Sequence, residues 1–286
     1  VSREILQQNR IMSNIRSNSV KKVLDKLKTV AEDKEEYAQF FEHYGRLIKE
    51  GVYQDFEHKD NLTELLRYNS TKDEGLVSFK EYVDRMKDDQ KSIYYITGRN
   101  QISLRNSPLL EMYEKMDIEV LLLDDEIDEI IIPSVPKYDE KELKSINRSG
   151  AADDFSEEKD KDKEKSLKPV LKKIKNILGE RVKDVILSNR LSESPSCIVA
   201  DEHDPTAQMQ ELMRSMGQTD LPEIKPILEL NPNHKIIISL KDKTKQKSFN
   251  DIALLLYEQA LIQEGVKLDN PSEFTERLNK VIIGTL

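Results

Sequence analysis

The sequence is poor in several residues on which common protein classes depend. It has one cysteine, Cys197, no tryptophan, four histidines and 9 glycines among 286 residues. A single cysteine cannot form a disulfide within the chain, and this is compatible with a reducing compartment among others. The histidines lack metal-ligand spacing, and we find no glycine-rich phosphate loop. The sequence therefore offers neither a disulfide scaffold nor a recognisable metal or nucleotide motif.

Long apolar runs and regions of one charge sign are also missing. No stretch approaches the roughly 18 apolar residues of a membrane span. The net charge is −9, from 45 basic and 54 acidic residues that are interleaved along most of the chain. We therefore expect no membrane and no nucleic-acid partner. The chain opens at Val1 without a methionine, and we interpret it as a fragment of a larger protein.

The first half of the chain changes from helical to mixed patterning. Residues 10–70 carry apolar side chains at helical spacing and predict three helices with short links. Residues 92–97 and 119–124 are apolar throughout and flank a predicted helix at 101–115. Such an order indicates a parallel strand pair packed on both faces. The run 130–133 is expected to add an edge strand, which Pro133 limits.

Residues 151–166 interrupt this pattern, because eleven of the sixteen residues are charged. We expect a mobile linker there. The remainder predicts a helix that ends at Gly179 and a methionine-rich helix at 206–216. Further strands are expected at 182–187, 196–200 and 235–240, and closing helices at 248–264 and 271–284.

These patterns predict an α+β multidomain protein. It should contain a helical coil segment at 1–75 and a small α/β/α domain with a short parallel sheet at 76–150. The charged linker at 151–166 then leads to an α+β C-terminal domain with dimerising helices at 167–286.

The helix at 206–216 is amphipathic, and its apolar residues share one face: Met209, Leu212, Met213 and Met216. Methionine surfaces suit promiscuous partners, because the side chain is flexible and polarisable. The same stripe also fits packing into a core. The sequence alone does not decide between partner binding and core packing.

The closing helices carry more apolar surface than one stripe requires. They form either an intramolecular hairpin or a four-helix bundle with a second copy of the chain. The candidate dimerisation residues are Phe249, Ile252, Leu255, Leu256, Leu278, Val281 and Ile282.

An acidic run follows the second predicted strand. Asp124 and Asp125 would lie at the carboxyl edge of a parallel sheet, where carboxylates can hold Mg²⁺. This would suit a doubly wound phosphotransfer enzyme. The alternative is a solvated start of a helix.

Several ordered segments resemble the bacterial form of the heat shock protein 90 family, which are ATP-dependent molecular chaperones. The resemblance covers essentially the whole chain and matches the C-terminal part of that family's middle domain followed by its dimerisation domain. The matching segments are residues 2–9, 47–51, 65–68, 77–87, 93–97, 118–123, 178–185 and 227–234.

The resemblance implies roles for particular residues. Arg3 would reach the γ-phosphate of ATP and Gln7 would lie beside it, while ATP and magnesium bind a separate N-terminal domain that is missing here. The helix at 206–216 would contact unfolded or partly folded client proteins. Ile130 stands near the position of a client-binding tryptophan in related bacterial members.

Taken together, the resemblance implies a cytoplasmic homodimeric chaperone. The fragment alone should bind no cofactor or metal and should not hydrolyse ATP, because it lacks an adenine pocket. The rival hypotheses are the phosphotransfer enzyme and a plain dimeric scaffold without clients.

Overall fold

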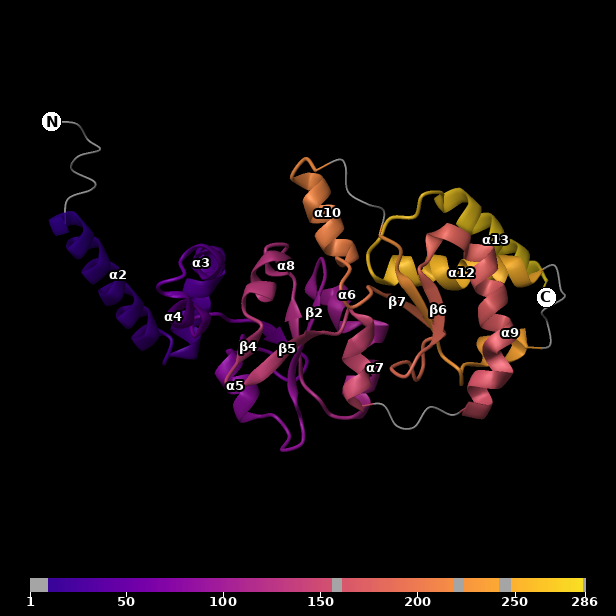
Figure 1. Cartoon of the computed structure of the whole chain (residues 1–286), viewed down its shortest axis with the longest axis horizontal. Helices are drawn as coiled ribbons and strands as arrows, with labels where there is room; N and C mark the ends of the chain where they lie inside the picture. The colour runs from indigo at the N-terminus through magenta and orange to yellow at the C-terminus, as the bar shows by residue number, and fades with distance from the viewer. Residues whose placement is uncertain (1–9, 156–160, 219–223, 242–247, 285–286) are drawn as a thin grey trace.

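The computed structural model describes residues 10–155, 161–218, 224–241 and 248–284. The chain is elongated, and three parts follow one another along its long axis (Figure 1). A helical segment comes first, a unit built on a five-stranded sheet follows, and a unit built on a three-stranded sheet ends the chain.

Helices α2 (Arg10–Val30), α3 (Lys34–Gln54) and α4 (Lys59–Thr63) form the first part, as the apolar spacing predicts. The Asp33 carboxylate caps α3 by accepting hydrogen bonds from the backbone N–H groups of Glu35 and Glu36, both at 3.0 Å. One face of α3 is buried against the following sheet unit, at Tyr37, Phe41, Ile48 and Val52.

The five-stranded sheet has the order β1-β3-β2-β5-β4. Strand β2 runs parallel to both β3 and β5, so the predicted parallel pair at 92–97 and 119–124 is confirmed. Alternate residues of β2 enter different cores, with Ile93 on one face and Tyr94 on the other. Strands β2 and β3 are largely apolar because both of their faces are covered. The polar strands β1, β4 and β5 lie toward the edges of the sheet. Their bounds are β1 (Asn69–Ser70), β2 (Ser92–Thr97), β3 (Val120–Leu123), β4 (Lys137–Tyr138) and β5 (Lys141–Ser145).

Short helices cover this sheet. Ser78 and Glu81 form a capping box at the start of α5. The helix expected at 101–115 is broken, because Ser107 caps a 3-10 turn that Pro108 begins. The elements are α5 (Phe79–Asp84), α6 (Gln101–Arg105), η1 (Pro108–Leu110), α7 (Glu111–Lys115), α8 (Asp128–Ile131) and η2 (Ile132–Ser134).

The edge strand expected at 130–133 is wrong. This run forms α8 and η2, and Ile131 and Ile132 pack into the core beneath the sheet. The edge is instead the β4–β5 hairpin. Its two turn residues, Asp139 and Glu140, both have positive φ angles, as a tight hairpin turn requires.

The mobile linker expected at 151–166 is also wrong for the residues described. Residues Ser149–Phe155 form the 3-10 helix η3, and α9 begins at Lys161. Phe155 packs against the Tyr94 ring at a centroid distance of 5.3 Å. Asp154 accepts a hydrogen bond from the Tyr94 hydroxyl at 2.7 Å. Phe155 and two small residues, Ala151 and Ala152, are enough to order this segment, because they pack against the core that the sheet already provides.

The last unit contains a three-stranded sheet of order β6-β8-β7. The strand expected at 235–240 is the helix α11, which His234 caps. Ile237 and Leu240 are buried three residues apart while Ile236 and Ile238 are exposed, which is a helical pattern. The sheet's central strand is β8. The elements are α9 (Lys161–Leu178), η4 (Gly179–Arg181), β6 (Asp184–Leu187), β7 (Ser196–Val199), α10 (Ala207–Ser215), β8 (Ile227–Leu230), α11 (Lys235–Leu240), α12 (Ser248–Gln263) and α13 (Pro271–Ile283).

Two arginines join the two sheet units reciprocally. Arg190 of the last unit is fully buried and donates to the carbonyl oxygens of Ile146 at 2.7 Å and Arg148 at 3.0 Å. Arg148 in turn donates to the carbonyl oxygens of Glu202 at 2.8 Å and Asp204 at 2.6 Å. We call these two side chains the arginine latch. Each holds backbone of the other unit, so the loop that leads into α10 is fixed at Asp204.

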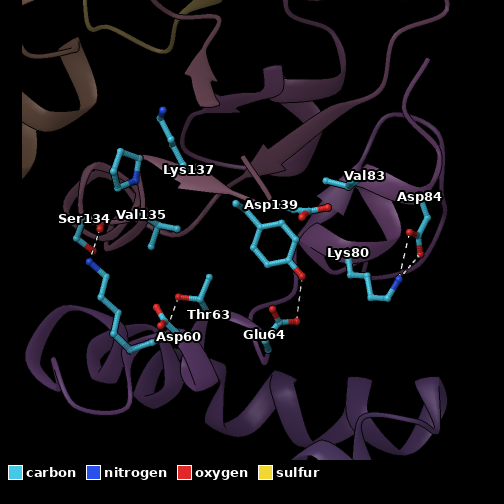
Figure 2. A pocket seen from close by; sticks show the side chains of 13 residues that line it. Asp60, Thr63, Glu64, Lys80, Val83, Asp84, Ser134, Val135, Lys137 and Asp139 are labelled. Carbon is cyan, nitrogen blue, oxygen red and sulfur yellow. Dashed lines mark hydrogen bonds and ion pairs between the residues drawn. The ribbon is translucent and has the colours of Figure 1, made fainter. Parts of the chain in front are cut away.

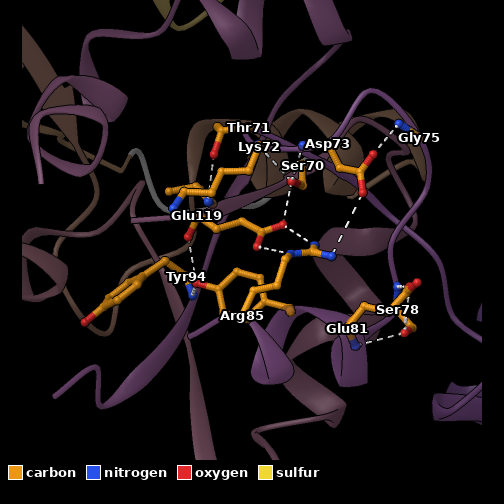
Figure 3. A network of polar contacts seen from close by, with 12 residues as sticks. Ser70, Thr71, Lys72, Asp73, Gly75, Ser78, Glu81, Arg85, Tyr94 and Glu119 are labelled. Carbon is orange, nitrogen blue, oxygen red and sulfur yellow. Dashed lines mark hydrogen bonds and ion pairs between the residues drawn. The ribbon is translucent and has the colours of Figure 1, made fainter. Parts of the chain in front are cut away.

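A buried carboxylate network stabilises the start of β3 (Figure 3). Glu119 accepts two hydrogen bonds from Arg85, at 2.6 and 3.0 Å, and one from the Ser70 hydroxyl at 2.6 Å. The Tyr82 hydroxyl donates to the Glu119 carbonyl oxygen at 2.6 Å. The network ties β1, α5 and β3 together, and its groups are hydrogen-bonded to one another.

Candidate functional site

The methionine-rich helix α10 stands out from the body of the molecule (Figure 1). The Thr206 hydroxyl caps it by accepting a hydrogen bond from the Met209 N–H at 3.1 Å. No residue of α10 is fully buried. Met209, Leu212 and Met213 are half-buried, whereas Met216 keeps 66% of its surface exposed. The predicted apolar face therefore exists, and it is only partly covered.

The first turn of α10 lies against α8. A cavity of about 180 Å³ separates the two, with Met209 and Thr206 on the α10 side and Glu129 and Ile132 on the α8 side. Ile130 is half-buried on α8 but does not line this cavity. The structure thus brings the two helices of the predicted client site together, with residues outside the predicted set between them.

The first two residues of α8 carry buried carboxylates. Asp128 is ion-paired with Lys49 at 2.9 Å, and burial nevertheless raises the pKa of Asp128 to about 7 against the opposing effect of Lys49. Burial likewise raises the pKa of Glu129, although the nearby hydroxyls of Thr97 and Thr206 oppose this. Glu129 Oε1 has no hydrogen-bond partner among the described residues.

The acidic run does not form the magnesium site that the rival phosphotransfer hypothesis requires. Asp124 is exposed, and Asp125 lies 3.4 Å from Lys49 and 3.9 Å from Arg46, so cations of the chain already neutralise it. Within the described ranges, no three His, Cys, Asp or Glu side chains are grouped to hold a metal ion. The geometry gives the phosphotransfer hypothesis no support.

The closing helices α12 and α13 pack on each other, and the predicted dimerisation residues divide into two groups. Phe249 and Leu256 lie in the chain's own core, at 0% and 2% exposure, so assigning them to a dimer surface is wrong. They are buried because α12 packs across β7 and α9. The other members are half-buried or exposed: Ile252, Leu255, Leu278, Val281 and Ile282. Leu278 and Ile282 retain 40% and 47% exposure.

Arg3 and Gln7 lie outside the described residues, so the structure says nothing of them.

A wider cavity of about 610 Å³ lies between α4, α5 and β4 (Figure 2). Several of its charged groups are already engaged, as in the Lys80–Asp84 pair at 2.8 Å and the Tyr138 hydroxyl bonded to Glu64 at 3.0 Å. We assign no ligand to it.

The family model described as Hsp90 protein matches residues 1–286. The chain belongs to the Hsp90 family. Among its relatives, the chaperone protein HtpG of Treponema denticola is 50% identical over 99% of this chain. HtpG of Borreliella burgdorferi is 45% identical over 99%, and HtpG of Legionella pneumophila is 42% identical over 100%. This Hsp90-family chain spans only 46% of the length of each of these relatives. No described helix is both long and apolar enough to cross a bilayer.

The residues that hold this site of the Hsp90-family chain in place could not be recognised in the sequence. Glu129 and Asp128 belonged to an acidic run that looked solvated, and Arg190 was one charge among many. Only the helical spacing of Ile131 and Ile132 with the preceding acids offered a signal, because it places Asp128 on the inward face of a helix.

Proposed function

We propose that this chain is the client-binding and dimerising part of an ATP-dependent molecular chaperone. It would comprise the C-terminal part of the middle domain and the C-terminal domain, in a cytoplasmic protein about twice as long. The observation that carries the client role is α10, an amphipathic methionine helix without a fully buried residue. Such a surface can pack against many different apolar segments.

A charge on the α10 face should abolish client protection. In Met213→Glu, an apolar client segment would have to bury a carboxylate, which costs about 2 kcal/mol or more and thus roughly thirtyfold in affinity. Aggregation of a thermally unfolding model protein, followed by light scattering, measures the effect. Met116→Glu is the matched control, because Met116 is 40% exposed but lies away from α10. Equal loss in both variants, or full protection by Met213→Glu, would contradict the client site.

The dimer role is supported by apolar side chains that α12 and α13 leave uncovered. Ile262, Leu278, Ile282 and Ile283 each retain at least 40% exposure. A second copy would bury this face in a four-helix bundle, which is isologous. The dimer would hold two chaperone arms at high effective concentration, so that they close as a clamp.

A charge on this face should dissociate the dimer. Leu278→Asp or Ile282→Asp places a carboxylate in each half of an isologous interface, and we expect a cost of about 3 kcal/mol or more. Light scattering across a dilution series should give twice 33.2 kDa for the parent chain and 33.2 kDa for the variants. Ile102→Asp is the control, since Ile102 is 77% exposed on α6. If the parent chain is monomeric, the clamp is ruled out, and α12 and α13 form an intramolecular hairpin instead.

In the intact protein, Arg3 would complete the ATPase site of the missing N-terminal domain, with Gln7 beside it. A guanidinium offers phosphate oxygens a permanently charged, bidentate fork. The chain alone would then bind neither ATP nor magnesium and would not hydrolyse ATP.

A further inference from the structure

A further cavity, of about 140 Å³, lies where the base of α10 meets the end of β7 and the C-terminal end of α12. Figure 1 shows these three elements beside one another. An apolar cavity with a few polar groups, placed where two packed units meet, is the usual form of a ligand site. The walls of this cavity are largely apolar and include Ile198, Pro205, Ile224, Pro226, Leu261 and Val266.

Glu264 is the one charged side chain among the described residues that line this cavity. Its carboxylate accepts a hydrogen bond from Asn147 Nδ2 at a long 3.4 Å, and Gln208 donates to its backbone carbonyl oxygen at the same distance. The cavity between α8 and α10 differs, because Arg148 lines it together with Glu129. Glu264 therefore brings a negative charge to an apolar cavity whose described lining contains no cation.

Two arginines in this region are already paired with other carboxylates. Arg190 lies 3.1 Å from Glu229, and Arg99 forms an ion pair with Glu211. Burial raises the pKa of Glu264 to about 7, against the opposing effects of two amide side chains and of Arg190. A cation that entered the cavity from outside the chain would favour the ionised carboxylate, since an opposite charge at close range stabilises it.

The cavity has the size and the polarity of a lysine side chain. An apolar cavity of about 150 Å³ takes a ligand as large as benzene, with about six non-hydrogen atoms. A lysine side chain is of similar size, and it combines a hydrocarbon stem with a terminal ammonium group. The stem would pack on the apolar walls, while the ammonium group would pair with Glu264.

We propose that this cavity binds an alkylammonium group, with the ammonium paired to the Glu264 carboxylate and the hydrocarbon stem packed on the apolar walls. In the chaperone the group would be a lysine side chain of a client held on α10, because Ala207, Gln208 and Gln210 of that helix line the same cavity. The assignment to a client lysine rests on the proposed function, whereas the alkylammonium site does not. Clients that carry a lysine close to apolar residues would then be preferred.

Binding of n-butylammonium, which corresponds to a lysine side chain, tests the site without any client. n-Butanol is the matched neutral probe, because it has the same stem. In an NMR titration at pH 8, we expect n-butylammonium to bind the parent chain about tenfold more tightly than n-butanol. Glu264→Gln should remove this difference and still bind n-butanol, which shows that the cavity is intact.

Asp269→Asn is the control variant, because it removes an exposed carboxylate close to Glu264 in sequence that does not line the cavity. It should keep the preference of the parent chain for the ammonium. Equal affinities of the parent chain for the two probes would overturn the proposal. An equal loss of n-butylammonium binding in Glu264→Gln and Asp269→Asn would also overturn it.

The same titration of the parent chain at pH 6 and pH 8 needs no variant. With a pKa of about 7, Glu264 is mostly protonated at pH 6 and mostly ionised at pH 8, whereas an alkylammonium group stays charged at both. At pH 6 the ammonium must displace a proton from Glu264, so its affinity should be about tenfold lower, and that of n-butanol should not change. The same n-butylammonium affinity at both pH values would refute the pairing with Glu264.

Acetylation of a client's lysines distinguishes a client side chain from a free amine. Acetylation removes the lysine charge, so a fluorescent unfolded model client should bind the parent chain about fivefold more weakly once it is acetylated. This difference should vanish in Glu264→Gln. Binding of n-butylammonium without an effect of acetylation would assign the site to free amines and reject the client lysine. Absence of n-butylammonium binding would reject the site, even if Met213→Glu upholds the client role of α10.

Discussion

Replacing Arg190 with methionine should lower the free energy of unfolding by about 3–5 kcal/mol, the loss typical of breaking a buried ion pair. The Arg190 side chain is 0% exposed and lies 3.1 Å from Glu229, which is 4% exposed. Without the guanidinium, Glu229 keeps a buried charge, and the carbonyl oxygens of Ile146 and Arg148 lose their donor. The variant therefore loses a charge pair and a connection between the two sheet units at once.

Urea denaturation followed by circular dichroism measures this loss. Lys183→Met is the matched control, because Lys183 is a half-exposed cation of the same unit that pairs with Asp204 at 2.9 Å. An exposed pair is worth about 0–1 kcal/mol, so this control should stay close to the parent chain. Arg190→Met/Glu229→Leu should recover part of the stability, since it removes the stranded carboxylate. A loss for Arg190→Met no larger than that of the control would contradict the latch.

The parts of the fold that local sequence determines were predicted, and the parts that depend on distant partners were not. The strands at 92–97 and 119–124 can be predicted from the sequence because apolar residues lie on both of their faces. The cap of α13 is a local feature of this kind, because the Asn270 side chain accepts a hydrogen bond from the N–H of Glu273, three residues further on. The run 235–240 could not be assigned in this way, because a short apolar run fits either a strand or a buried helix.

Only the part of the site that follows from helical spacing could be predicted from the sequence. Met209, Leu212 and Met213 share a helix face in any α-helix, so α10 was correctly anticipated. The burial of Glu129 depends on α10 and on β2, which are far from it in sequence. Phe249 and Leu256 were wrongly assigned to the dimer interface. A helix with apolar residues on all sides does not show from its sequence which side packs against its own domain.

Helix α8 connects the helical segment to α10 through adjacent carboxylates that point to different partners. Asp128 faces Lys49 of α3, and Glu129 faces the cavity under α10. The position of α8 therefore depends on the Lys49 pair. A change that moves α8 should therefore also alter its contact with α10.

Replacing Lys49 with methionine should lower the free energy of unfolding by up to about 2 kcal/mol more at pH 8.5 than at pH 6, because only the ionised Asp128 loses an ion pair. The pKa of Asp128 is about 7 in the folded chain, above its ordinary value of 3.8, so its contribution to stability falls as pH rises between these values. Without Lys49 the pKa of Asp128 rises further. At pH 6 Asp128 is mostly neutral in both chains, whereas at pH 8.5 the parent chain holds a paired carboxylate and the variant must bury an unpaired charge or keep the proton.

Urea denaturation at the two pH values measures this difference. Lys80→Met is the control, because Lys80 pairs with Asp84 at 2.8 Å and both side chains are more than half exposed. It should cost less than about 1 kcal/mol at either pH. Lys49→Met/Asp128→Leu should lose the pH dependence and regain stability, since no carboxyl group remains at position 128. An equal loss at pH 6 and pH 8.5 for Lys49→Met would show that Lys49 acts through packing, and that the charge of Asp128 does not set the position of α8.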